Sequence, residues 1–301
     1  MKNGQLMKPT KSLLVILILF SHCSSNPENI PQSESSRLSK EYFRLAGQGD
    51  ALAQYNLGLK YQNGQGVSKD QQEAFKWYEL SAKQGHPQAQ GNLGWMYEKG
   101  QGTSQDYQKA LQWYRLAAGQ DLVQAQYNLG LMYEQGQAVT QDLQEAFKWY
   151  RLAADQGDTD AQHNLAKLYQ IGQAAPKDDQ KALKWYRLAA DQGHSSAQYN
   201  LGLMYESGSG VSQDYQIALK WYEFSANKGH SEAQMRLGLT YFIGKIAKQN
   251  YVKSYKWFAL AAASGVKVAQ RNLDLAATKM TSSQLKKAKK LVSEWKSTRI
   301  E

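Results

Sequence analysis

The stretch Ala74-Phe75-Lys76-Trp77-Tyr78 recurs at a fixed interval along most of the chain. Its tryptophan reappears every 36 residues, each time followed by tyrosine or, in the last copy, by phenylalanine. The tryptophans of this series are Trp77, Trp113, Trp149, Trp185, Trp221 and Trp257. A constant period of this length indicates a repeat array, in which each unit buries its apolar face against its neighbours. The 301 residues are therefore expected to form one elongated array rather than two globular domains.

Each unit contains two segments with helical periodicity. In the first unit, Ala53, Leu57 and Tyr61 recur every four residues, which predicts a helix over residues 53–61. Gly64 follows where a left-handed residue can end that helix.

The second helix of each unit is predicted to begin after an N-cap residue, because aspartate recurs at one position. The series is Asp70, Asp106, Asp142, Asp178 and Asp214, with Asn250 in the last unit. Glu73 and Glu145 lie three residues after their caps, a spacing typical of a capping box.

A glycine recurs inside the first helix of most units. Glycine costs about 1 kcal/mol relative to alanine in a helix interior, so its repeated use needs a packing reason. We predict that two helix backbones come into near contact at this position. The series is Gly58, Gly94, Gly130, Gly202 and Gly238, with Ala166 in the fourth unit.

The net charge of +10 is concentrated at the two ends of the chain. Residues 1–22 carry +3 and residues 267–301 carry +6, which leaves about +1 for the repeats. An array that is nearly neutral lacks the basic stripe that follows a phosphate backbone, so we expect no nucleic-acid partner.

Residues 1–22 have the composition of an export signal. Three lysines precede the apolar run 13–20, which is too short to span a bilayer and is expected to be part of a cleaved signal peptide. Cys23 is the only cysteine and lies where a bacterial lipoprotein carries its lipid, although His22 before it departs from that pattern. Lipidation of Cys23 and ordinary cleavage nearby therefore both stay open. Residues 23–37 are polar and contain two prolines, as expected of a flexible tether.

The repeated pattern resembles the Sel1-like repeat, a relative of the tetratricopeptide repeat. The resemblance rests on Ala-x-x-x-Leu-Gly-x-x-Tyr-x-x-Gly in the first helix, Ala-x-x-Trp-Tyr in the Asp-capped second helix, and Ala-Ala before a terminal glycine. It covers residues 38–295 and implies an all-α fold, a right-handed α-solenoid of helix-turn-helix repeats. The implied parts are a capping half-repeat (38–49), six Sel1-like repeats (50–265) and basic C-terminal capping helices (266–301).

The resemblance also implies that the first helices line a concave groove, which binds a protein or peptide segment. Positions that face away from the apolar side of these helices carry aromatic and asparagine side chains in several units. We expect the partner-binding residues to be Tyr55, Asn56, Asn92, Trp95, Tyr127, Asn128, Tyr199 and Asn200. Two alternatives remain: the rings pack between adjacent first helices, or the asparagines form a ladder between repeats.

No spacing of residues indicates catalysis, and we expect no cofactor and no metal. His86, His194 and His230 share one position between units, which is typical of turn or cap residues rather than zinc ligands. The sequence thus favours a non-catalytic scaffold or adaptor, exported in a bacterium to the periplasm or held at the membrane through Cys23. An enzyme that binds or hydrolyses cell-wall ligands is less favoured, because the relatives linked to that activity carry paired cysteines. A secreted, host-directed effector remains a further alternative.

The last predicted helix carries four lysines within residues 286–290. They are consistent with a polar outer face that ends the array in water, or with contact to anionic lipid or an acidic partner. The sequence favours the first interpretation.

Overall fold

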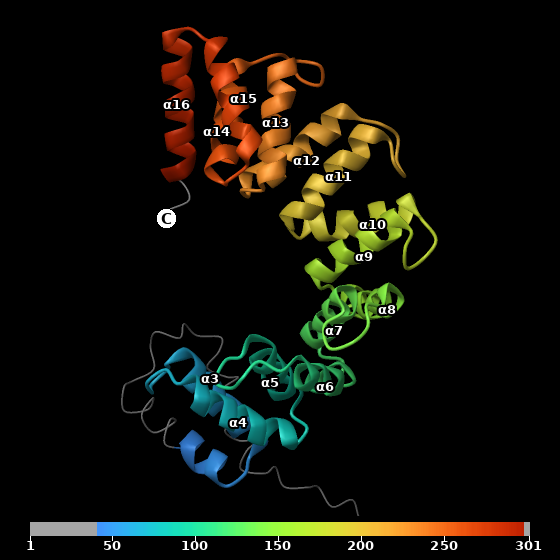
Figure 1. The fold of residues 1–301 in the computed structure, drawn as a ribbon, viewed down its shortest axis with the longest axis vertical. Helices are drawn as coiled ribbons and strands as arrows, with labels where there is room; N and C mark the ends of the chain where they lie inside the picture. The colour runs from blue at the N-terminus through green and yellow to red at the C-terminus, as the bar shows by residue number, and fades with distance from the viewer. Residues whose placement is uncertain (1–40, 298–301) are drawn as a thin grey trace, which may run out of the picture. The chain divides into compact units, whose positions relative to one another are not determined.

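A computed structural model describes residues 41–297, which are helical apart from their connecting turns (Figure 1). The predicted signal peptide, the tether, Cys23 and the first residues of the predicted half-repeat lie outside the described residues. The chain divides into two compact units, of which the described parts are residues 41–105 and 106–297. Each unit is described separately below.

The helices alternate between two kinds, called here A helices and B helices. In the first unit, residues 41–47 are helical, and the A helices α3 (Ala51–Asn63) and α5 (Pro87–Lys99) flank the B helix α4 (Gln71–Lys83).

In the second unit, B helices are followed in turn by A helices, and one further helix ends the series. The B helices are α6 (Tyr107–Ala118), α8 (Leu143–Asp155), α10 (Asp179–Asp191), α12 (Tyr215–Asn227) and α14 (Tyr251–Ala263). The A helices are α7 (Val123–Gln135), α9 (Thr159–Ile171), α11 (Ser195–Ser207), α13 (Ser231–Ile243) and α15 (Lys267–Thr278), and α16 (Ser282–Ser297) comes last. Helices that follow one another from α6 to α15 pack together, while α16 packs on α14. The predicted all-α solenoid is confirmed.

The helix ends follow the predicted chemistry, although the A helices are longer than expected. The first begins at Ala51 because the Asp50 side chain accepts a hydrogen bond from the Ala53 amide at 2.8 Å. It ends at Gly64, whose φ of 73° is left-handed. Capping therefore fixes where α3 starts and stops, whereas α7 and α15 begin without a side-chain cap.

The predicted capping box is formed only in part. The Asp70 side chain accepts hydrogen bonds from the amides of the second and third helical residues, as expected. The Asp70 amide, however, donates to the Tyr61 carbonyl at 2.9 Å and needs no bond from Glu73. Glu73 instead accepts from Lys76 at 2.6 Å. The link from the N-cap back to helix A thus replaces the reciprocal bond of the box.

The recurring glycine makes room for an aromatic ring, so the prediction of two helix backbones in near contact was wrong. A Cβ atom on Gly58 would lie 2.6 Å from the ring of Tyr78, and one on Gly130 would lie 2.5 Å from the ring of Tyr150. Both tyrosines are completely buried. The ring of helix B therefore rests directly on the backbone of helix A in the same repeat.

A buried glutamine in each A helix except α15 was missed in the sequence. Gln162 is a typical case: its side-chain amide donates to the Ala154 carbonyl of the preceding B helix at 3.2 Å. Its oxygen accepts from Gln192 at 2.9 Å. The series is Gln54, Gln90, Gln126, Gln162, Gln198 and Gln234, and each member is buried. These glutamines supply buried polar links between neighbouring repeats.

This pairing predicts a stabilising substitution at Lys228. Lys228 occupies the position of Gln192 one repeat later, and the buried side-chain oxygen of Gln198 has no hydrogen-bond partner. Lys228→Gln is expected to supply the missing donor and raise the free energy of unfolding by about 1 kcal/mol. Urea unfolding of this variant beside Lys228→Ala tests the prediction. Equal stability of the two variants would contradict it.

Candidate functional site

The four aromatic residues predicted to bind a partner lie on the A helices, and all four are half-buried. In the first unit, Tyr55 of α3 and Trp95 of α5 pack against the same buried cluster of Ala74, Tyr78 and Met96. Asn56 and Asn92 are also half-buried there. The first unit therefore brings two of the predicted rings to one cluster.

In the second unit, Tyr127 and Tyr199 occupy equivalent positions on α7 and α11. Their rings lie 5.9 Å from Tyr150 and 5.7 Å from Tyr222, measured between centroids. Burial, aided by nearby carboxylates, raises the pKa of Tyr127 to about 12. Tyr127 is therefore a neutral phenol, able to donate or accept a hydrogen bond.

The three histidines that precede A helices, His86, His194 and His230, are N-cap residues, as predicted. The Nδ1 atom of His86 accepts from the Ala89 amide at 3.3 Å, and His194 and His230 do the same in their own repeats. Rings of the preceding A helix stack on these caps, for example Tyr55 on His86 at 4.7 Å. The cap histidines thus cover one side of the aromatic series.

The asparagines form bonds inside the array. Asn92 acts against the burial that raises the pKa of Tyr78, and Asn164 does the same for Tyr127 of the preceding repeat. Asn200 donates to the Nε2 atom of His163, also one repeat earlier, at 3.1 Å. At these positions the interpretation as a ladder between repeats is supported, and the role of the asparagines in binding stays a prediction.

A cavity of about 570 Å³ lies at the A helices α7 and α9 of the second unit. Tyr127, Leu131 and Glu134 come from α7, and Asn164 and Lys167 from α9. Three glutamines also line it, together with Leu143, Leu168 and the exposed Ile171. Of the predicted residues in the second unit, only Tyr127 is among the lining residues. Asn128, Tyr199 and Asn200 lie elsewhere on the A helices.

The charges in this cavity are held in place by neighbours. Glu134 accepts a hydrogen bond from the buried Tyr150 hydroxyl at 2.5 Å and from Lys167 at 3.3 Å. Two repeats later, Glu206 accepts from Tyr222 at 2.5 Å and is paired with Arg236. Arg236 interrupts the asparagine series because it reaches this carboxylate across the repeat boundary. Sequence reasoning missed Glu134 and Lys167, since their partners come from other helices.

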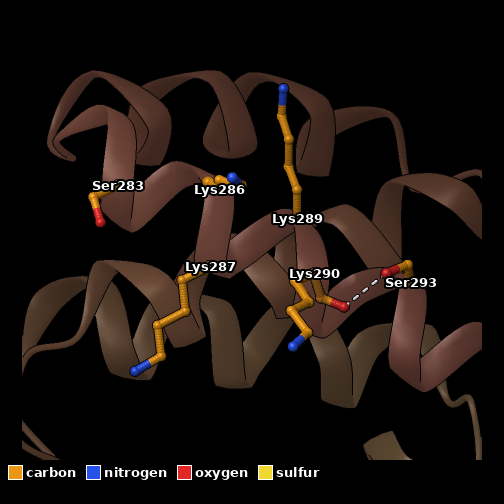
Figure 2. A pocket seen from close by; sticks show the side chains of 6 residues that line it. All are labelled: Ser283, Lys286, Lys287, Lys289, Lys290 and Ser293. Carbon is orange, nitrogen blue, oxygen red and sulfur yellow. Dashed lines mark hydrogen bonds between the residues drawn. The ribbon is translucent and has the colours of Figure 1, made fainter.

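The lysines of α16 surround a second, open cavity of about 590 Å³ (Figure 2). Lys286, Lys287 and Lys289 are exposed, and Lys290 lies 3.6 Å from Glu294. Ala288, between them in sequence, is completely buried. The helix thus turns a small apolar face inward and a basic face outward, as expected of a helix that ends an array in water.

Within residues 41–297, no cluster of three or more histidine, cysteine or acidic side chains could hold a metal ion. A search of the same part of the chain finds no helix of the length and apolarity needed to cross a membrane.

A family model described as the Sel1 repeat matches six consecutive segments, residues 51–86, 87–122, 123–158, 159–194, 195–230 and 231–266. Among solved structures, a Sel1 repeat protein from Oxalobacter formigenes shares 36% identity over 71% of this chain and 86% of its own, with a TM-score of 0.66. A protective antigen of uropathogenic Escherichia coli strains, with an SLR fold, shares 30% identity over 84% of this chain and 62% of its own, with a TM-score of 0.58. No curated protein matches the chain significantly.

Proposed function

Because the chain belongs to the Sel1 repeat family, whose members are generally protein-interaction modules, we propose that it is a non-catalytic scaffold that binds a protein or peptide segment on its A helices. The observation that carries this proposal is the cavity around Tyr127, where a half-buried phenol lies beside the ion pair of Glu134 and Lys167. The combination suits a peptide, which presents both apolar side chains and backbone amides.

Each part of the cavity has a role in this proposal. Leu131 and Leu168 provide apolar surface for a side chain of the partner, and Tyr127 adds a ring that is held rigid by Tyr150. The lining glutamines offer amide donors and acceptors for a bound backbone. Lys167, whose side chain is half exposed, can pair with an acidic group of the partner.

The proposal includes export in a bacterium, which residues 1–22 favour, and a tether through Cys23 as one way to hold the protein at a membrane. The mass of the mature protein distinguishes a lipidated Cys23 from simple cleavage. A protein that retains residues 1–22 would contradict export.

The binding face is tested by capture of partners from bacterial envelope extract with the full chain as bait. The site variant is Tyr127→Ala/Lys167→Ala. The matched control, Tyr215→Ala/Lys245→Ala, removes the same residue types at exposed positions of the same unit. We expect partners identified by mass spectrometry to be retained by the control and reduced at least about tenfold in the site variant. Equal capture by both variants would show that the cavity is not the binding site.

A further inference from the structure

The B helices carry an exposed apolar residue at one repeated position. In the second unit, the exposed fractions are 52% for Leu116, 46% for Leu152, 39% for Leu188 and 56% for Phe224. In the first unit, Leu80 at the same position is 45% exposed. Single exposed leucines are ordinary, but a large apolar residue at one position of consecutive helices forms a continuous feature. In the second unit these four residues are 36 residues apart, the length of one repeat. They therefore occupy equivalent positions and share one face of that unit.

The last repeat shows what covers this position. Leu260 of α14 is equivalent to the exposed residues but only 2% exposed. What distinguishes α14 from the other B helices is the additional packing of α16 against it (Figure 1). Ala288 of α16 is completely buried, and Val292 and Trp295 pack against the cluster that contains Leu260. Their spacing, i, i+4 and i+7, is that of one face of an amphipathic helix.

The charged neighbours of three of the four exposed residues bond to a tyrosine of the following A helix, whereas Arg151, next to Leu152, pairs with Asp155 on its own helix. Arg187, next to Leu188, donates to the hydroxyl of Tyr205 on the following A helix. Arg115, next to Leu116, makes the equivalent bond to Tyr133 at 2.7 Å. In the last repeat, alanine takes the arginine position. The fixed arginines therefore leave the apolar side chains open, at a position where α14 already binds a helix.

We propose that the series Leu116, Leu152, Leu188 and Phe224 is a second interaction surface, and that it binds an amphipathic helix of a partner protein in the way that α14 binds α16. The partner helix carries apolar residues at i, i+4 and i+7 and acidic residues beside them. Apolar contact provides the affinity, as in other complexes in which a helix lies on an apolar groove.

The acidic flanks follow from the charges around the series. Lys184 and Lys220 lie one turn before Leu188 and Phe224 on the exposed side of their helices. Along the described chain, neither these two lysines nor Arg115 and Arg187 form an ion pair with a carboxylate. Around Leu152, Lys148 and Arg151 are paired with Glu145 and Asp155, and Glu223 next to Phe224 accepts from Tyr241. A partner helix with acidic flanks would therefore meet positive charge without an ion-pair partner at Arg115, Lys184, Arg187 and Lys220.

The test uses two peptides and the full chain. The first probe is the peptide of residues 282–297, which corresponds to α16, and the second is the same peptide with its lysines replaced by glutamate. Binding is measured by fluorescence anisotropy at physiological salt. The surface variant is Leu152→Glu/Leu188→Glu. The matched control, Gln144→Glu/Gln180→Glu, adds the same charge at exposed positions of the same two helices, α8 and α10.

We expect the acidic peptide to bind with a Kd below about 100 µM and more tightly than the basic one. The surface variant should weaken its binding at least about tenfold, and the control less than about threefold. Both variants should remain folded, as thermal unfolding can show, although the surface variant should unfold at a somewhat lower temperature because Leu152 and Leu188 are only 46% and 39% exposed. Failure of the acidic peptide to bind, tighter binding of the basic peptide, or equal loss in both variants would overturn the proposal. Self-association that depends on Leu152 and Leu188, without peptide binding, would also overturn it, in favour of a second copy as the occupant. These outcomes are independent of partner capture by the cavity at Tyr127, which lies on an A helix.

Discussion

Replacing Tyr150 by alanine is expected to lower the free energy of unfolding by about 4 kcal/mol. Tyr150 is completely buried in the main apolar cluster of the second unit. Its ring fills the space over Gly130, so its removal leaves a cavity between helices A and B of one repeat. Helix A is held in place by the bond from Gln156 to Gln126 and by the ion pair of Glu134 with Lys167 in the next repeat, so it has little freedom to move in and fill this cavity. The cavity should therefore stay largely open, and most of its free-energy cost should appear as a lower free energy of unfolding.

The hydroxyl and the ring of Tyr150 contribute separately. Tyr150→Phe removes only the hydrogen bond to Glu134 and should cost about 1–2 kcal/mol, because Lys167 still pairs with that carboxylate. The chain offers a natural precedent in Phe258, which takes the tyrosine position of the last repeat, where Phe242 replaces the carboxylate.

Urea unfolding followed by circular dichroism measures these losses, and Tyr215→Ala is the matched control. Tyr215 is an exposed tyrosine of the same unit, and its removal should cost less than about 0.5 kcal/mol. Because repeats are stabilised mainly by their neighbours, hydrogen exchange of Tyr150→Ala should quicken first in α7 and α8. Similar losses in Tyr150→Ala and Tyr215→Ala would show that the ring does not hold the repeat together.

The sequence was sufficient to predict the features that depend on local chemistry. Asp70 caps a helix because its side chain bonds amides two and three residues away, and Gly64 ends one because of its own φ. His86 was placed as a cap for the same reason. The period of the tryptophans predicted the solenoid, because stacking of identical units is what such a period requires.

The features that were missed depend on side chains from different helices. A polar Gln162 on an otherwise apolar face reads as solvent-exposed until its partners, Ala154 and Gln192, are placed beside it. The recurrence of a buried glutamine in six of the seven A helices was a usable signal. The glycine was predicted to be necessary, but the atom that requires it belongs to a ring on the next helix.

The candidate site was only partly predictable for the same reason. Tyr127 was identified, whereas Glu134 and Lys167 were not, because the ion pair joins residues 33 positions apart in the sequence. The exposed series on the B helices was also overlooked, since a leucine beside the buried Trp-Tyr motif reads as core. Only the contrast between Leu260 and Leu188 reveals it.

The second unit should lose stability in mild acid, and His163 should make the largest contribution. His163 occupies the position that tyrosine takes in the repeat before it (Tyr127) and in the repeat after it (Tyr199). Its Nδ1 atom faces the Asn164 oxygen at 3.1 Å, and its Nε2 atom accepts from the Asn200 amide at 3.1 Å. This arrangement fixes the neutral ring with its proton on Nδ1, because protonation of Nε2 would break the bond from Asn200.

The surroundings of His163 disfavour its charged form. Burial, aided by stacked His194 and by Lys167, lowers the pKa of His163 to about 4. The bond to Asn164 and, to a smaller extent, the charge of Asp160 act in the opposite direction, and Asp160 is also paired with His194 at 2.9 Å. The ordinary pKa of a histidine, 6.5, applies to the unfolded chain. The native state therefore binds its proton at a lower pH than the unfolded state does.

The sign of the effect follows from this difference. Above pH 6.5 the ring is neutral in both states and stability is complete. As the pH falls from 6.5 towards 4, the unfolded chain takes up a proton that the native site refuses, so the free energy of unfolding decreases. Between pH 6.5 and pH 4, the free energy of unfolding should decrease by about 2–3 kcal/mol in total.

His163→Tyr isolates this contribution, because tyrosine is the residue that the chain itself uses at the equivalent positions Tyr127 and Tyr199. The variant should be about as stable as the wild type at pH 7.5 and more stable by about 2–3 kcal/mol at pH 4.5. Urea unfolding at pH intervals between these values measures the difference.

The pKa values of His86 and His230 are also lowered by burial, but these residues are common to both proteins, so their effects cancel in the comparison. Parallel stability profiles for the two proteins would exclude His163 as the source of acid sensitivity.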